Sequence, residues 1–82
     1  MYTIYFDGDN IITGDIKIVE VIDQNANANL GRLSVVGSGP PVPVSISVSR
    51  SGFGYVQYRN VTNNLAWIGV PFMNDGDHIH VL

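Results

Sequence analysis

Hydrophobic and polar residues alternate along several short stretches of the chain, and this alternation predicts β-strands. The clearest stretch is Val44 to Ser49, VSISVS, in which three aliphatic side chains point to one face and three serines to the other. Residues 16 to 22 carry isoleucines on one face and valines on the other. A strand that is apolar on both faces is usually covered on both faces. In a chain of 82 residues, another copy of the chain is one such cover.

Turn-forming residues divide the chain into about seven strands of this kind. Besides the two above, strands are expected at residues 2–6, 32–36, 55–61, 65–70 and 78–82. The Asp-Gly pair in DGDN predicts a tight hairpin after the first strand, with Ile11 and Ile12 beginning the return. Residues 23–31, DQNANANLG, are the predicted main loop, because Asn and Gly tolerate left-handed backbone conformations. The prolines of GPPVP predict that strand pairing resumes only at Val44.

These short strands and the absence of a convincing helix predict an all-β protein. Valine and isoleucine dominate the apolar residues, and β-branched side chains fit a pleated sheet better than a helix. We expect one domain over residues 1–82, built as a small antiparallel β-sandwich or barrel, immunoglobulin-like or jelly-roll-like. The sequence does not choose among these topologies.

The low charge of the chain changes what is expected of its surface. Charged residues make up 13% of the chain and hydrophobic residues 45%, whereas soluble domains usually contain about 25% charged residues. A core this small leaves apolar side chains outside, and a surface with few charges is poorly protected against association. We therefore expect a non-enzymatic structural subunit that self-associates as a homo-oligomer or docks on a larger assembly. A phage capsid decoration or tail component of a virion is an example of such a subunit.

Aromatic and apolar residues at turns and strand ends are the candidates for the contact surface. Protein interfaces are enriched in aromatic residues and Met, and their centres are depleted of charge. One phenylalanine lies between glycines in SGFG, and another precedes Met at the end of LAWIGVPFM. The valines of residues 16–22 add an apolar strand face. The predicted interface residues are Phe53, Phe72, Met73, Val19 and Val21.

A small carbohydrate-binding, lectin-like domain is the alternative function. Amphipathic aromatic rings can stack on a sugar while neighbouring amides form hydrogen bonds with its hydroxyl groups. The candidate residues are Tyr55, Tyr58, Trp67 and Asn60. Trp67 taken alone is expected in the centre of the core. With the remaining aromatic and amide residues, a glycan is kept as an alternative partner.

The two histidines of HIHVL are candidate metal ligands. His78 and His80 are two residues apart, so on a strand both imidazoles share one face and can converge on a Zn or Cu ion. A third ligand would have to come from Asp75, or from another strand, for example from Asp23. The interpretation that we favour places Ile79 and Val81 in the core, and the imidazoles of His78 and His80 at the solvent or at an interface. No cofactor is therefore predicted.

Asp7 and Asp9 are interpreted as turn residues. A calcium loop of the EF-hand type would need Gly at its sixth position and Glu at its twelfth, where this chain has Ile12 and Ile18. Turn formation is sufficient to explain two aspartates in DGDN.

Several classes of function are disfavoured by composition. Four Lys and Arg residues and a net charge of -3 leave no basic stripe for nucleic acid. The longest apolar stretch is far shorter than the about 20 residues needed to cross a bilayer, and the first residues lack the pattern of a signal peptide. Neither a Gly-x-Ser-x-Gly elbow nor a P-loop is present, and the chain has a single glutamate, Glu20. We expect a soluble protein that is not an enzyme and binds neither nucleic acid nor membrane.

Overall fold

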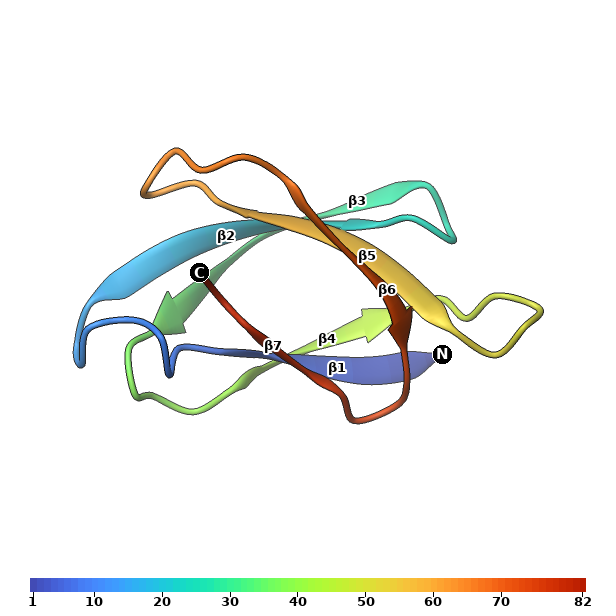
Figure 1. Cartoon of the computed structure of the whole chain (residues 1–82), viewed down its shortest axis with the longest axis horizontal. Helices are drawn as coiled ribbons and strands as arrows, with labels where there is room; N and C mark the ends of the chain where they lie inside the picture. Colours follow the sequence, from blue (N-terminus) through green and yellow to red (C-terminus); the bar gives the residue numbers. More distant parts are fainter.

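The computed structural model describes all 82 residues and contains seven strands in two sheets, with no helix. The two sheets form two layers that do not close into one barrel (Figure 1). The prediction of an all-β fold with about seven short strands is therefore confirmed. The strands are β1 (Tyr2–Asp7), β2 (Ile16–Asp23), β3 (Ala28–Val36), β4 (Val42–Ile46), β5 (Gly54–Asn60), β6 (Ile68–Met73) and β7 (His78–His80).

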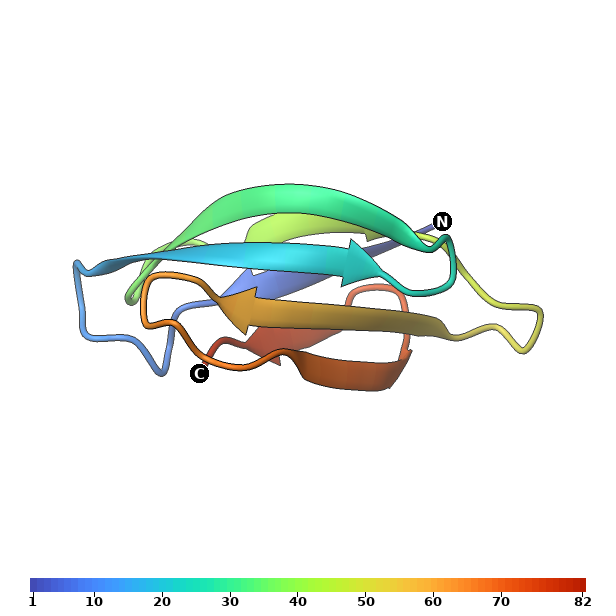
Figure 2. The ribbon, with the colours of Figure 1, turned by 90° about the horizontal axis from the view of Figure 1, so that it is seen from above.

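Strand order separates the chain into a small and a large sheet. The small sheet has the order β4-β1-β7, and the large sheet has the order β3-β2-β5-β6, which Figure 2 shows from above. All pairs in the large sheet are antiparallel. In the small sheet, β1 is antiparallel to β4 but parallel to β7. The last strand therefore lies beside the first and runs in the same direction.

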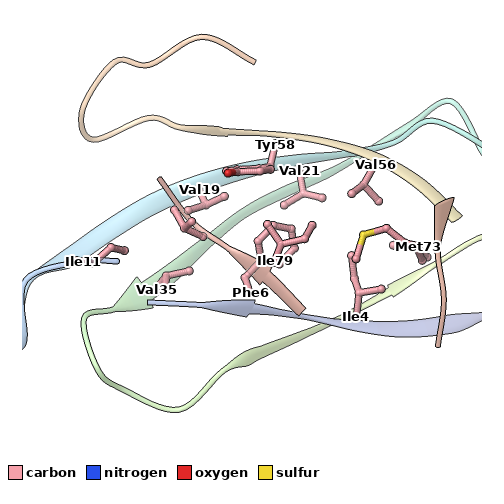
Figure 3. Close-up of a cluster of buried hydrophobic side chains, with 12 residues drawn as sticks. Ile4, Phe6, Ile11, Val19, Val21, Val35, Val56, Tyr58, Met73 and Ile79 are labelled. Carbon is pink, nitrogen blue, oxygen red and sulfur yellow. The ribbon is translucent and has the colours of Figure 1, made fainter. Parts of the chain in front are cut away.

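Twelve buried apolar side chains fill the space between the two sheets (Figure 3). From the small sheet, Ile4 and Phe6 of β1 point inward and are 0% exposed. From the large sheet, Val19 and Val21 of β2 point toward them and are 0% and 1% exposed. The ring of Phe6 meets that of Tyr58 edge to face, with 5.8 Å between ring centroids. Side-chain alternation along β1 and β2 thus decides which of their residues join the core.

The segment after β1 does not form the predicted hairpin. Residues 8–15 contain turns but no strand, and Ile11 packs into the core with 8% exposure. Gly8 lies so close to β3 that a Cβ at this position would be 2.3 Å from the carbonyl oxygen of Val36. The amide of Ser38 also donates a hydrogen bond to the Gly8 carbonyl oxygen at 3.1 Å. These contacts between distant segments override the local hairpin preference of Asp-Gly.

A hairpin between β2 and β3 replaces most of the predicted loop over residues 23–31. Strand β3 already begins at Ala28, so only residues 24–27 form the turn. The buried carboxylate of Asp23 accepts hydrogen bonds from the amides of Asn25 at 3.1 Å and Ala26 at 3.3 Å. It also accepts one from the amide of Ser47 at 2.7 Å. Asp23 therefore closes the turn and joins it to the segment after β4.

Strand β4 contains a proline and begins two residues before the predicted start at Val44. It is an edge strand that pairs only with β1, and Pro43 lies opposite Tyr5. An edge strand needs backbone hydrogen bonds on one side only, so it tolerates a residue that has no amide hydrogen. The predicted inward face of this strand is confirmed for two residues: Val44 packs against the core, and Ile46 is fully buried.

The buried phenol of Tyr58 predicts a loss of stability at high pH. Tyr58 is 2% exposed, and burial raises its pKa above the ordinary value of 10.0. A raised pKa in the folded state stabilises the fold below the unfolded-state pKa, and this stabilisation is lost as the pH rises through the folded-state value. We expect the free energy of unfolding, measured by urea titration, to fall above about pH 10. The fall should be smaller in Tyr58→Phe, which keeps the ring but cannot ionise; an equal fall in both proteins would contradict this prediction.

Candidate functional site

Two phenylalanine rings stand together on the surface where β5 begins and β6 ends, at the right-hand end of the molecule in Figure 1. Phe53 lies just before β5, and Phe72 is the penultimate residue of β6. The rings meet edge to face, with 5.5 Å between centroids and 90° between planes. The side chain of Phe72 is 69% exposed and that of Phe53 is 38% exposed. These two residues, called the Phe pair below, form an apolar contact point on the surface.

The backbone of Phe72 is unusual for a residue with a large side chain. Its φ of 61° lies in the left-handed region, which costs a residue with a Cβ roughly 1–2 kcal/mol. Glycine and asparagine are the residues that normally occupy this region. The pairing of β5 with β6 shifts register between Gly54 and Val56, close to Phe72. The backbone of Phe72 is thus held in an unfavourable conformation that presents its ring to solvent.

A shallow cavity of about 220 Å³ opens beside the Phe pair. It is smaller than the about 300–1,000 Å³ of typical small-molecule sites. Its size therefore suits an occupant no larger than one side chain or one small ring. No charged residue takes part in the lining. The lining residues are Asn25, Ser49, Ser51, Phe53, Gly54, Tyr55, Pro71 and Phe72.

The polar residues of this cavity hold the loop that carries Phe53. The side-chain amide of Asn25 donates hydrogen bonds to the backbone oxygens of Phe53 at 2.9 Å and Ser47 at 3.3 Å. The hydroxyl oxygen of Ser49 accepts one from the amide of Phe53 at 3.2 Å. Because these polar groups already have hydrogen-bond partners within the chain, the aromatic rings of the lining provide most of the contacts available to an occupant.

The structure divides the predicted interface residues into two groups. Phe53 and Phe72 lie together on the surface. In contrast, Val19, Val21 and Met73 are 0%, 1% and 3% exposed and belong to the core of the chain itself. Their placement at an interface is corrected: the inner face of β2 is covered by the small sheet, and Met73 points inward because the β5–β6 register shift breaks the alternation of β6 before this residue.

The predicted sugar-binding residues do not form one platform. Tyr58 and Asn60 occupy the inner face of β5, with 2% and 3% exposure. The side-chain amide of Asn60 donates a hydrogen bond to the backbone oxygen of Leu82 at 3.0 Å, so this amide already has a partner within the chain. Tyr55 and Trp67 are exposed, and of the four residues only Tyr55 lines the cavity.

Trp67 does not occupy the core position expected for it. Its side chain is 37% exposed, and the guanidinium of Arg59 lies 5.1 Å from the centroid of its ring. Arg59 also pairs with Glu20 on the neighbouring strand β2, at 2.9 Å. Hydrogen bonding to Arg59 lowers the pKa of Glu20 below its ordinary value. The outer face of β2 is therefore not apolar throughout. Glu20 lies on it between Ile18 and Ile22 and forms an ion pair with Arg59 of β5.

The two histidines lie on the outer face of β7, while Ile79 and Val81 point into the core with 5% and 0% exposure. The predicted inward and outward orientation of these four residues is confirmed. The Nδ1 atom of His78 is 2.8 Å from Oδ2 of Asp7, and the ring of His78 stacks on Tyr5 with 4.9 Å between centroids.

His80 pairs with the second aspartate of DGDN. Its Nδ1 atom lies 2.8 Å from Oδ2 of Asp9 and 3.7 Å from Oδ2 of Asp7. Hydrogen bonding to Asp9 raises the pKa of His80, and hydrogen bonding to His80 lowers the pKa of Asp9. Two carboxylates and two imidazoles thus form one surface cluster at the ends of β1 and β7.

The carboxylates proposed from the sequence as partners of the histidines have other roles. Asp75 accepts a hydrogen bond from the amide of Thr3 at 2.8 Å, and Asp23 is buried in the turn after β2. Asp7 and Asp9, interpreted as turn residues, are the carboxylates that reach the histidines. Asp7 and Asp9 are two residues apart, as are His78 and His80, and this matching spacing was the only signal in the sequence. The two pairs meet only because β1 and β7 are parallel neighbours.

Comparison with known proteins provides no relatives: no protein-family model, no curated protein and no solved structure matches this chain significantly. The chain forms no helix of the length and hydrophobicity needed to span a membrane. Its function must therefore be inferred from its own surface features.

Proposed function

We propose that this chain is a non-enzymatic interaction subunit that associates with a second copy of itself through the Phe pair. The observation that carries the proposal is Phe72, whose ring is 69% exposed on a left-handed backbone. Stability of a lone domain would favour Gly or Asn at this position. Phe lowers monomer stability and exposes apolar surface, so its advantage has to come from a contact.

A second copy suits the chemistry of this surface. The ring of Phe72 protrudes directly beside a cavity of side-chain size, so two copies related by a twofold axis can each place a ring in the cavity of the other. No charged residue lines the cavity, so two chains of net charge -3 can meet there without like charges in contact. Strand β6 is also an edge of the large sheet, and its backbone is open to pairing.

Larger assemblies are an extension of the same proposal. With 13% charged residues and a surface contact of this kind, the domain suits a repeated structural unit more than a free monomer. A capsid decoration or tail component of a phage is the type of assembly that we propose.

Replacing Phe72 with aspartate is expected to abolish self-association. A carboxylate buried without a partner at the interface would cost several kcal/mol. The monomer should stay folded, because residue 72 is exposed and aspartate tolerates a left-handed backbone better than phenylalanine does. Molar mass measured by sedimentation equilibrium over a range of concentrations should show an oligomer for the wild type and a monomer for Phe72→Asp.

The matched control is Ile12→Asp. Ile12 is 76% exposed and belongs to the β1–β2 connection, which lies at the opposite end of the long axis from the start of β5 (Figure 1). This variant should keep the wild-type mass. A wild-type chain that stays monomeric at high concentration, or a Phe72→Asp variant that remains oligomeric, would contradict the proposal.

A carbohydrate is the second candidate occupant, and the exposed ring of Tyr55 at the cavity favours it. The engaged hydrogen-bonding groups of Asn25 and Ser49 count against it. A glycan array distinguishes the two functions, because sugar binding that is lost in Tyr55→Ala and kept in Ile12→Asp would identify a lectin-like domain.

A further inference from the structure

We infer that the cluster of Asp7, Asp9 and His80, with His78 beside it, binds a divalent transition-metal ion of the Zn²⁺ type. One ligand atom from each of the first three residues lies within 4.8 Å of the others. The cluster belongs to the ends of β1 and β7 in the small sheet and shares no residue with the Phe pair. The inference is therefore independent of the proposed self-association.

Distances in the cluster are close to those of a coordinated ion. Ligand atoms bound tetrahedrally to one ion at about 2.0–2.2 Å are about 3.3–3.6 Å apart. The Nδ1 atom of His80 is 2.8 Å from an Asp9 oxygen and 3.7 Å from an Asp7 oxygen. Adjustments of roughly 1 Å would bring all three atoms to bonding distance. The side chains of His80 and Asp9 are 55% and 59% exposed and can make such adjustments, while that of Asp7 is only 15% exposed and stays in place.

The charges in the cluster favour a bound cation. The carboxylates of Asp7 and Asp9 converge without a Lys or Arg partner, since their ion pairs involve only histidines. The one arginine–carboxylate pair of the protein, Arg59 with Glu20, lies on the large sheet. Neighbouring carboxylates repel each other. A divalent ion would neutralise both carboxylates at once.

The backbone holds the ligands in position before an ion arrives. Parallel pairing of β1 with β7 places Asp7 opposite His80, and the backbone amide of Val81 donates a hydrogen bond to the backbone carbonyl oxygen of Asp7 at 3.1 Å. The Asp7 carboxylate is 2.8 Å from Nδ1 of His78, whose ring stacks on Tyr5. His78 therefore acts as an orienting partner of the Asp7 ligand, as groups around metal ligands commonly do.

The set of ligand atoms indicates which ion fits. Calcium and magnesium take oxygen ligands, so an imidazole nitrogen disfavours both. The chain has no cysteine to favour soft ions such as Cu⁺. One nitrogen and two carboxylate oxygens suit Zn²⁺, and three protein ligands on an exposed surface leave a fourth position open to water or to a group from another molecule.

Isothermal titration calorimetry of the whole chain with ZnCl₂ near neutral pH tests the inference. We expect one Zn²⁺ ion per chain and at least about tenfold weaker binding of Ca²⁺ and Mg²⁺. His80→Gln and Asp9→Asn should each weaken Zn²⁺ binding at least about tenfold. Asp75→Asn is the matched control, because it removes an exposed carboxylate outside the cluster, and it should bind Zn²⁺ like the wild type.

Nuclear magnetic resonance of the wild type keeps the test valid if a variant fails to fold. Zn²⁺ should shift amide signals of residues 7–9 and 78–81 first. The inference is overturned if these signals do not move, or if folded His80→Gln binds Zn²⁺ as tightly as Asp75→Asn. Phe72→Asp should bind Zn²⁺ normally, so a failure of metal binding and a failure of self-association are observed separately.

Discussion

Replacing Phe6 with alanine is expected to lower the free energy of unfolding by about 3–5 kcal/mol, the usual cost of removing a buried aromatic ring. Phe6 is fully buried in the middle strand of the small sheet and packs edge to face against Tyr58 of the opposite sheet. The chain has no cysteine and therefore no disulfide to reinforce a core of twelve residues. Because typical domains have a total stability of about 5–15 kcal/mol, this variant should lose a large part of its stability.

Urea titration followed by circular dichroism measures this loss. The same substitution at the surface, Phe72→Ala, is the matched control, and at low protein concentration it should change the free energy of unfolding by less than about 0.5 kcal/mol. Equal losses in the two variants would contradict the assignment of Phe6 to the core and Phe72 to the surface.

Replacing Gly37 with alanine is expected to cost about 3 kcal/mol or more, although only one methyl group is added. Gly37 is buried beside the β1–β2 connection, and its Cβ would lie 2.0 Å from the carbonyl oxygen of Ile12. The same backbone is fixed by hydrogen bonds from the Gly37 amide to Asp15 at 2.8 Å and from the Gly14 amide to Gly37 at 3.1 Å. The obstructing atom belongs to the backbone, so a rotated side chain cannot relieve the clash.

The control is Gly52→Ala. Gly52 has a φ of 87°, and an added Cβ would meet no atom within 4 Å. Alanine there should cost only about 1–2 kcal/mol, the price of a left-handed backbone. Thermal unfolding of both variants compares the two effects, and a Gly37→Ala variant at least as stable as Gly52→Ala would show that the close approach is absent.

Strand positions were predictable because alternation is a local property of an extended backbone. The inward set on β4 that includes Val44 and Ile46 follows from the sequence, as does the inward orientation of Ile79 and Val81. Strand ends were less predictable. The prolines before Val44 indicated a break, yet an edge position allows Pro43 within a strand, and edge position is not encoded within a single segment.

The surface features depended on contacts between distant segments. Asp75 appeared to be the partner of the histidines because it is near them in sequence, whereas Asp7 is 71 residues away from His78 and touches it. In the same way, alternation alone could not show that the register shift between β5 and β6 accompanies an outward Phe72 next to a buried Met73.

By itself, the sequence determined that this protein is built from about seven short strands, that it has few charges, and that its apolar residues alternate with polar ones. Tertiary structure decided which strands are neighbours, which aromatic rings remain outside, and which carboxylates meet the imidazoles of His78 and His80. The physical reason is that a strand is specified by steric preferences within a few residues, whereas strand pairing depends on the total packing of segments far apart in the chain.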